Sequence, residues 1–81
     1  MVKIKLFVIA RVKFQVREVE IDAKSINDAL VLLAEKFGVK SRDLKKFLIY
    51  VNEVNISQLK MYRTELKDGD VVMFLSPSSG G

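Results

Sequence analysis

The two residues of this chain whose type and position suggest chemistry are Gly80 and Gly81, which follow the Ser/Pro stretch of residues 76–79. Because glycine has no Cβ, two in succession can thread a channel too narrow for any other residue. The carbonyl carbon of Gly81 is then an unhindered site for acyl chemistry inside another protein. Ends rich in glycine and serine are also typical of frayed linkers and cloning remnants, so the tail alone leaves both interpretations open.

The composition excludes most other chemistry, because the 81 residues include no Cys and no His. Disulfides, thiol nucleophiles, imidazole acid–base catalysis and zinc sites of the usual kind are therefore ruled out. We expect no bound metal, no stably bound cofactor and no autonomous active site, since no acid–base constellation is visible. Any reaction must use carboxylates, lysines, hydroxyls or the end of the chain.

Length and charge indicate one small globular domain, with 49% hydrophobic residues, 30% charged residues and a net charge of +4. Lysine and glutamate are interspersed, which favours a mixed solvated surface over a nucleic-acid-binding stripe. No apolar run approaches the ~20 residues that span a bilayer, and the first residues lack the apolar stretch of a signal peptide. We therefore expect a cytoplasmic protein that binds neither nucleic acid nor membrane.

The elements that must position the tail begin with two runs of alternating apolar residues, over 2–8 and 14–21. Period two predicts two strands, which lie close enough in sequence to pair as an antiparallel hairpin that turns near residues 11–13. The phase of the second run breaks between Val16 and Val19, which suggests a bulge or a turn there.

A helix follows the hairpin, with Ser25 as its N-cap, Asp28 in its first turn and Gly38 after its last residue. Its apolar residues recur at helical spacing and form one stripe that must be buried. The remaining elements are, in order, a short helix at 41–44, a strand at 47–51, a turn at Asn52-Glu53, an edge segment at 54–56, a helical turn at 58–62, a turn at 67–70 and a last strand at 71–75.

This order of elements predicts an α+β fold of the ubiquitin-like β-grasp type, a mixed sheet with one main helix on one face. The right-handed crossover through the helix makes the first and last strands parallel neighbours at the centre of the sheet. We place the domain at residues 1–75 and a flexible tail at residues 76–81.

These residues resemble the MoaD/ThiS family of ubiquitin-like sulfur carriers along the whole chain. The resemblance rests on the order of elements, the turn of residues 66–72, the Val51-Asn52 pair and the ending from Phe74 to Gly81. The length and the extra segment of residues 39–46 are closer to the small subunit of molybdopterin synthase than to the shorter thiamine-pathway carrier. Family members often have a glycine in the first hairpin and two prolines before the tail, whereas this chain has Arg11-Val12-Lys13 and only Pro77.

The resemblance implies that Gly81 is the reactive residue and that Gly80 gives the tail access to the partner's channel. An E1-like (MoeB-like) enzyme would use ATP to adenylate the Gly81 carboxylate, which is ionised at neutral pH because its pKa is about 3.3–3.7. A persulfide would then convert it to a thiocarboxylate, and its sulfur would pass to a pterin precursor in a larger, MoaE-like subunit during molybdenum cofactor biosynthesis. Pro77 restricts its own φ and the residue before it, so the tail extends roughly 20 Å at ~3.3–3.6 Å per residue.

A docking surface is also expected on the sheet face opposite the helix. The phase of the first strand turns Phe7 to that face, and the resemblance implies that Val72 and Phe74 lie inside, which leaves Met73 and Leu75 outside. Because one helix covers only one face of the sheet, we expect an exposed apolar patch near the root of the tail, with Lys3 and Lys5 at its rim. Aromatic residues and methionine are typical anchors of protein interfaces. The patch consists of Phe7, Leu48, Tyr50, Met73 and Leu75, and Pro77 follows it as a further partner contact.

Three other functions remain open at this point. The chain is alternatively a ubiquitin-like modifier conjugated through Gly81, or a thiamine-pathway sulfur carrier, since all of these need the same activated tail. It is otherwise a plain β-grasp binding module without chemistry at its end, for example an RNA-contacting domain, which a clustered basic face would favour.

Overall fold

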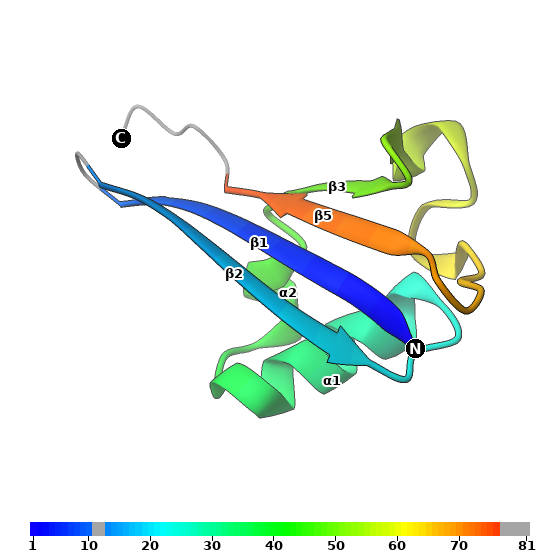
Figure 1. Cartoon of the computed structure of the whole chain (residues 1–81), viewed down its shortest axis with the longest axis horizontal. Coiled ribbons are helices and arrows are strands. Elements are labelled where there is room, and N and C mark those ends of the chain that lie inside the picture. Colours follow the sequence, from blue (N-terminus) through cyan, green and yellow to red (C-terminus); the bar gives the residue numbers. More distant parts are fainter. Residues whose placement is uncertain (11–12, 77–81) are drawn as a thin grey trace.

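The first and last strands lie side by side at the centre of a five-stranded sheet in the computed structural model, which describes residues 1–10 and 13–76 (Figure 1). The sheet order is β2-β1-β5-β3-β4, with β1 antiparallel to β2 and parallel to β5. This confirms the predicted α+β fold of the β-grasp type. The strands are β1 (Val2–Ala10), β2 (Lys13–Ile21), β3 (Leu48–Val51), β4 (Val54–Asn55) and β5 (Val71–Leu75).

The main helix, α1 (Ile26–Phe37), begins and ends at the predicted residues. Ser25 Oγ accepts a hydrogen bond from the backbone N–H of Asp28 at 3.2 Å, which caps the first turn. Gly38 closes the helix with a φ of 66°, in the left-handed region that glycine adopts at little cost. The single-turn helix α2 (Ser41–Leu44) follows it, and both helices lie on the same side of the sheet (Figure 1).

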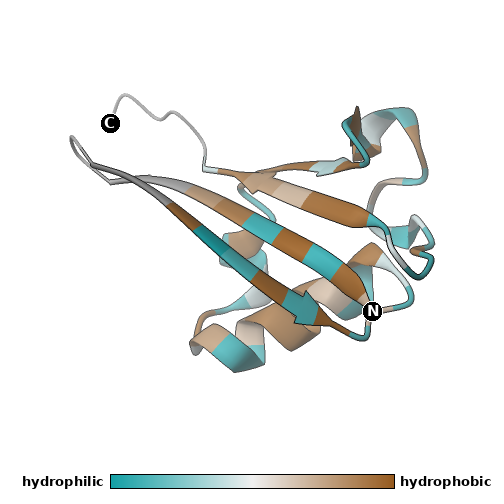
Figure 2. Ribbon diagram, in the orientation of Figure 1, coloured by the Kyte–Doolittle hydropathy of each residue, from teal (hydrophilic) through white to brown (hydrophobic). Residues whose placement is uncertain are grey.

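The hydrophobic core lies between α1 and the sheet face that it covers. Alternate residues of β1, β3 and β5 point into it, and Figure 2 shows this period as bands of teal and brown along β1. Phe74 of β5 is fully buried, and its ring meets the Phe47 ring edge to face at 6.2 Å between centroids. Among the described residues, the largest fully buried side chains are those of Val2, Ile4, Ile26, Leu30, Leu33, Val72 and Phe74.

The expectation of a bulge or a turn between Val16 and Val19 is wrong. The β1–β2 pairing runs without interruption from Val2↔Ile21 to Ala10↔Lys13, and residues 11–12, where the turn was predicted, lie outside the described residues. Val19 pairs with Ile4 on the core side, whereas Val16 pairs with Phe7 on the opposite side and is 51% exposed. The apparent phase break therefore arises because one apolar side chain, that of Val16, lies on the outer face of a regular strand.

The chain between β4 and β5 also differs from expectation. The helical turn predicted over 58–62 is replaced by two 3-10 turns, η1 (Ile56–Gln58) and η2 (Met61–Arg63). Thr64, which is buried, stabilises the second turn because its Oγ1 donates to the Met61 carbonyl at 2.7 Å and accepts from the Lys60 N–H at 3.0 Å. No helix in the described ranges is long and apolar enough to cross a membrane.

The predicted turn at residues 67–70 is confirmed and fixes the start of β5. Gly69 has a φ of 90°, and its N–H donates to the Met1 carbonyl at 2.9 Å. The Lys3 N–H donates to the Asp70 carbonyl at 3.0 Å, so the turn is attached to the beginning of β1. The Met1 ammonium group hydrogen-bonds the Asp68 carboxylate and thereby lowers the pKa of that carboxyl below its usual value.

Candidate functional site

The tail leaves the sheet from its centre, beside two neighbouring strands. Leu75, the last residue of β5, pairs with Phe7 of β1 on one side and with Leu48 of β3 on the other. The next residue, Ser76, donates its N–H to the Phe7 carbonyl at 2.8 Å. The position from which the tail departs is therefore held by backbone hydrogen bonds. Pro77, Gly80 and Gly81, which the sequence singles out, lie outside the described residues.

The register places the five residues of the predicted docking surface on the sheet face opposite α1. Paired residues of neighbouring strands project their side chains to the same face. One row across the sheet is formed by Phe7, Leu75 and Leu48, and the next contains the pair Met73 and Tyr50. We call these five residues the outer patch. Leu48 is 49% exposed and the other four are half-buried. The residues beside them that are buried in the core are Leu6, Ile49, Val51, Val72 and Phe74.

Val16 extends the outer patch and was not among the predicted site residues. It lies directly opposite Phe7, so the first row continues from β3 across β5 and β1 to β2. In the sequence, the alternation of apolar residues breaks after Val16. This break is the signal that the apolar side chain of Val16 lies on the same exposed face as Glu18 and Glu20. Because that break was interpreted as a bulge, Val16 was not recognised as part of this surface.

A shallow hollow of about 460 Å³ lies on the same face, beside the outer patch. Its apolar wall contains Phe7 and Met73, and Lys5 and Glu53 contribute charged groups to its lining. Lys3, also expected at the rim, lies 3.7 Å from Glu18 through its Nζ atom, so these two exposed side chains form an ion pair on β1 and β2. In residues 1–10 and 13–76, no group of three acidic side chains is placed to hold a metal ion.

The family of the chain follows from a match to a family model. The model of the ThiS family matches residues 4–81, which is nearly the whole chain and includes both terminal glycines. The chain belongs to the ThiS family. The β-grasp domain described above is therefore the ubiquitin-like sulfur carrier fold of that family. No curated protein shows a significant match.

Three solved structures show how the ThiS-family fold recurs. A chain from the complex of subunits 1 and 2 of the molybdopterin-converting factor of Helicobacter pylori is 28% identical, with a TM-score of 0.61, over 99% of this chain and 97% of that one. The small archaeal modifier protein 1 of Methanosarcina acetivorans is 26% identical, with a TM-score of 0.67, over 99% and 95%. A Haloferax volcanii protein at 22% identity and a TM-score of 0.60, over 99% and 87%, shows the fold alone.

Proposed function

We propose that this chain is a sulfur carrier that acts as the small subunit of a molybdopterin synthase. In this role the Gly81 carboxyl carries sulfur as a thiocarboxylate and delivers it to a pterin precursor held by a larger subunit. The observation that carries the proposal is the ThiS-family match, which extends through Gly81. The similarity to a chain of the Helicobacter pylori two-subunit complex supports the choice of molybdenum cofactor biosynthesis and of a large-subunit partner.

The chemistry needs activation because an ionised carboxylate is a poor electrophile. An E1-like enzyme transfers AMP from ATP to the Gly81 carboxylate and releases pyrophosphate. The terminal sulfur of a donor persulfide then attacks the acyl carbon, the C–O bond to AMP breaks, and AMP leaves. A thiol cleaves the resulting acyl disulfide by thiol–disulfide exchange, which leaves the thiocarboxylate on Gly81 and a disulfide on the donor side.

The described residues support two requirements of this role. The tail needs a rigid base, and Ser76 is hydrogen-bonded to β1 where β5 ends at the centre of the sheet. The partners need a surface that aligns the tail with their active sites, and the outer patch reaches that same point through Leu75 and Phe7. We assign the outer patch as the docking surface for the activating enzyme and for the large subunit. These two partners then bind in turn.

A second candidate function has its own observation. The similarity to the small archaeal modifier protein 1 favours a modifier that is joined to other proteins through Gly81. The two functions share the adenylated tail and differ in the nucleophile that displaces AMP, which is a sulfur atom in one and a lysine amine in the other.

The experiment that tests the proposal combines the chain with ATP, an E1-like enzyme and a persulfide donor, followed by intact-mass measurement. We expect the mass shift of one oxygen replaced by sulfur, and then molybdopterin formation when the large subunit and the pterin precursor are added. Attachment of the chain to other proteins in place of that shift identifies the modifier. The mass shift can also occur without molybdopterin formation. If thiazole then forms in a thiamine assay, the chain is assigned to the thiamine pathway.

The control is a pair of tail variants. Deletion of Gly81 removes the reacting carboxyl from its position, and we expect no sulfur transfer from this variant. Ser78→Ala changes the same tail but keeps both glycines, and we expect it to react as the wild type does. Normal turnover by the chain without Gly81 contradicts the proposal.

A further inference from the structure

The free edge of β2 is a second candidate for an interaction surface, away from the outer patch. β2 is an end strand of the sheet and pairs only with β1 among the described strands. Exposed strand edges carry unpaired backbone groups that accept a further strand from another chain. Nine residues of β2 pair with β1, so the opposite edge offers a long template.

The hydrogen bonds around β1 fix which backbone groups of β2 point outward. The Lys3 N–H donates to Asp70, and the Phe7 carbonyl accepts from Ser76, so the odd-numbered residues of β1 turn their backbone groups toward β5. Backbone direction alternates along a strand, so Ile4 faces β2 and its partner Val19 faces β1. The N–H and C=O groups of Glu18 and Glu20 therefore point to the free edge.

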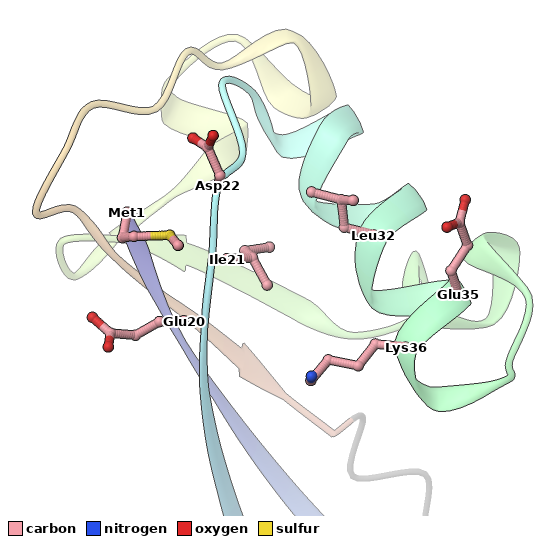
Figure 3. A pocket seen from close by; sticks show the side chains of 7 residues that line it. All are labelled: Met1, Glu20, Ile21, Asp22, Leu32, Glu35 and Lys36. Carbon is pink, nitrogen blue, oxygen red and sulfur yellow. The ribbon is translucent and has the colours of Figure 1, made fainter.

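A shallow groove of about 470 Å³ lies along this edge, between the end of β2 and α1 (Figure 3). Ile21 of β2 and Leu32 of α1 lie on its two sides, and Met1, on the side of β2 away from α1, also contributes to its lining. Leu32 is 36% exposed and Met1 61%, whereas Ile21 is 9% exposed, so Leu32 and Met1 supply the part of this apolar lining that is open to solvent. A side chain that enters the groove from an added strand would bury this surface.

The charges around the groove indicate the charge of the segment that it binds. Glu20, Asp22 and Glu35 line it together with Lys36 and with Met1, whose ammonium group is already hydrogen-bonded to Asp68, although the whole chain has a net charge of +4. In the described part of the chain the carboxylates of Glu20, Asp22 and Glu35 form no close ion pair, although Glu20 and Asp22 interact with the Met1 ammonium over a longer distance. Glu18, by contrast, is paired with Lys3. The locally negative potential favours a basic segment.

β1 already shows which pattern fits β2. Over residues 2–6 lysine alternates with aliphatic side chains, and Lys3 and Lys5 lie opposite Glu20 and Glu18 on the outer face. The free edge of β2 presents the same two faces, because side chains of paired residues share a face. A second copy of this chain fits less well there, since a β2–β2 pairing centred on Glu18 or Glu20 sets glutamates against each other.

We propose that the free edge of β2 and the groove beside α1 bind an extended segment of a partner protein in which basic residues alternate with aliphatic ones. The basic residues pair with Glu18 and Glu20, and the aliphatic ones pack on Ile21 and Leu32. The added strand leaves the outer patch uncovered, because it lies on an edge of the sheet rather than on its face.

The test uses the full chain labelled with nitrogen-15 and a short, end-blocked peptide in which lysine alternates with valine. Amide hydrogen exchange is followed by NMR. We expect binding to slow exchange at the Glu18 and Glu20 amides by about tenfold or more and to leave the Val19 amide unchanged, because it already faces β1. Binding without new protection at Glu18 and Glu20 overturns the proposal.

Peptide and protein controls separate this site from general charge attraction. A peptide in which lysine alternates with serine keeps the charge, and we expect it to bind about tenfold more weakly because the groove stays unfilled. Glu20→Lys is expected to weaken binding of the lysine–valine peptide about tenfold, whereas Glu53→Lys makes the same charge change at the β3–β4 turn and is expected to have little effect. Equal effects of the two substitutions, or equal binding of the two peptides, contradict the proposal.

Discussion

Asn52 and Asp70 are joined side chain to side chain, with Asn52 Nδ2 donating to Asp70 Oδ1 at 3.0 Å. The other amide atom, Asn52 Oδ1, accepts from the Val71 N–H at 3.0 Å, and Asp70 Oδ2 accepts from the Lys67 N–H at 2.8 Å. The pair thus links the turn between β3 and β4 to the turn that starts β5. The strand that supports the tail is fixed at its beginning by these contacts and at its end by Ser76.

Replacing Asn52 tests this link. Asn52→Ala removes both side-chain hydrogen bonds and places alanine at a φ of 49°, so we expect the free energy of unfolding to fall by about 1–2 kcal/mol. Asn52→Gly removes the same bonds without the backbone strain and is expected to lose less. Urea denaturation of the wild type and the two variants measures the loss due to the hydrogen bonds and the loss due to backbone strain. A glycine variant less stable than the alanine variant argues against a strained turn.

Leu48 tests the outer patch. Leu48→Glu introduces a charge on the proposed docking face, and we expect it to weaken binding of the activating enzyme and of the large subunit about tenfold or more. Val31→Glu is the matched control, because Val31 is 53% exposed on α1 and Leu48 is 49% exposed. Both variants are expected to fold. Isothermal titration with each partner measures the difference, and equal affinities for the two variants exclude Leu48 from the interface.

The edge-to-face contact of Phe47 and Phe74 is expected to contribute beyond simple burial. We expect Phe74→Leu to lower the free energy of unfolding by about 1–2 kcal/mol, because Phe74 is completely buried. A double-mutant cycle with Phe47→Leu is expected to give a coupling of about 0.5–1.5 kcal/mol. Strictly additive losses in chemical denaturation indicate that the ring geometry is not energetically important.

Gly38 ends α1 with a φ of 66°, and a Cβ placed there meets no atom within 4 Å. The cost of Gly38→Ala is therefore backbone strain alone, about 1 kcal/mol of unfolding free energy. Gly38→Asn is expected to cost less, since asparagine tolerates the left-handed region. Thermal unfolding ranks the stabilities of the variants. A loss of unfolding free energy well above about 1 kcal/mol for Gly38→Ala indicates a steric contact that the structure does not show.

Most of the fold could be predicted because its signals are local. Ser25, Asp28 and Gly38 mark the ends of α1 by their own chemistry, and residues 67–70 form a turn because Gly69 takes a positive φ. Pairing between distant strands is different, since the face of Val16 depends on its register with Phe7. The two 3-10 turns could not be foreseen either, because Thr64 stabilises η2 through contacts that the spacing of apolar residues does not encode.

The site was predictable to the same extent. Strand alternation placed Phe7 on the outer face, whereas the outward phase of Met73 and Leu75 was taken from the family resemblance, and the register of β5 with β1 and β3 agrees with it. Their role in docking stays a prediction, as do the roles of Pro77, Gly80 and Gly81, which lie beyond the described residues.

The parallel pairing of β1 and β5 also has a mechanical consequence. A pull on the end of β5 is directed along the strand, so its bonds to β1 and to β3 are loaded together in shear rather than opened one after another. A domain held by its tail in a tight channel can therefore bear traction without unravelling from that end.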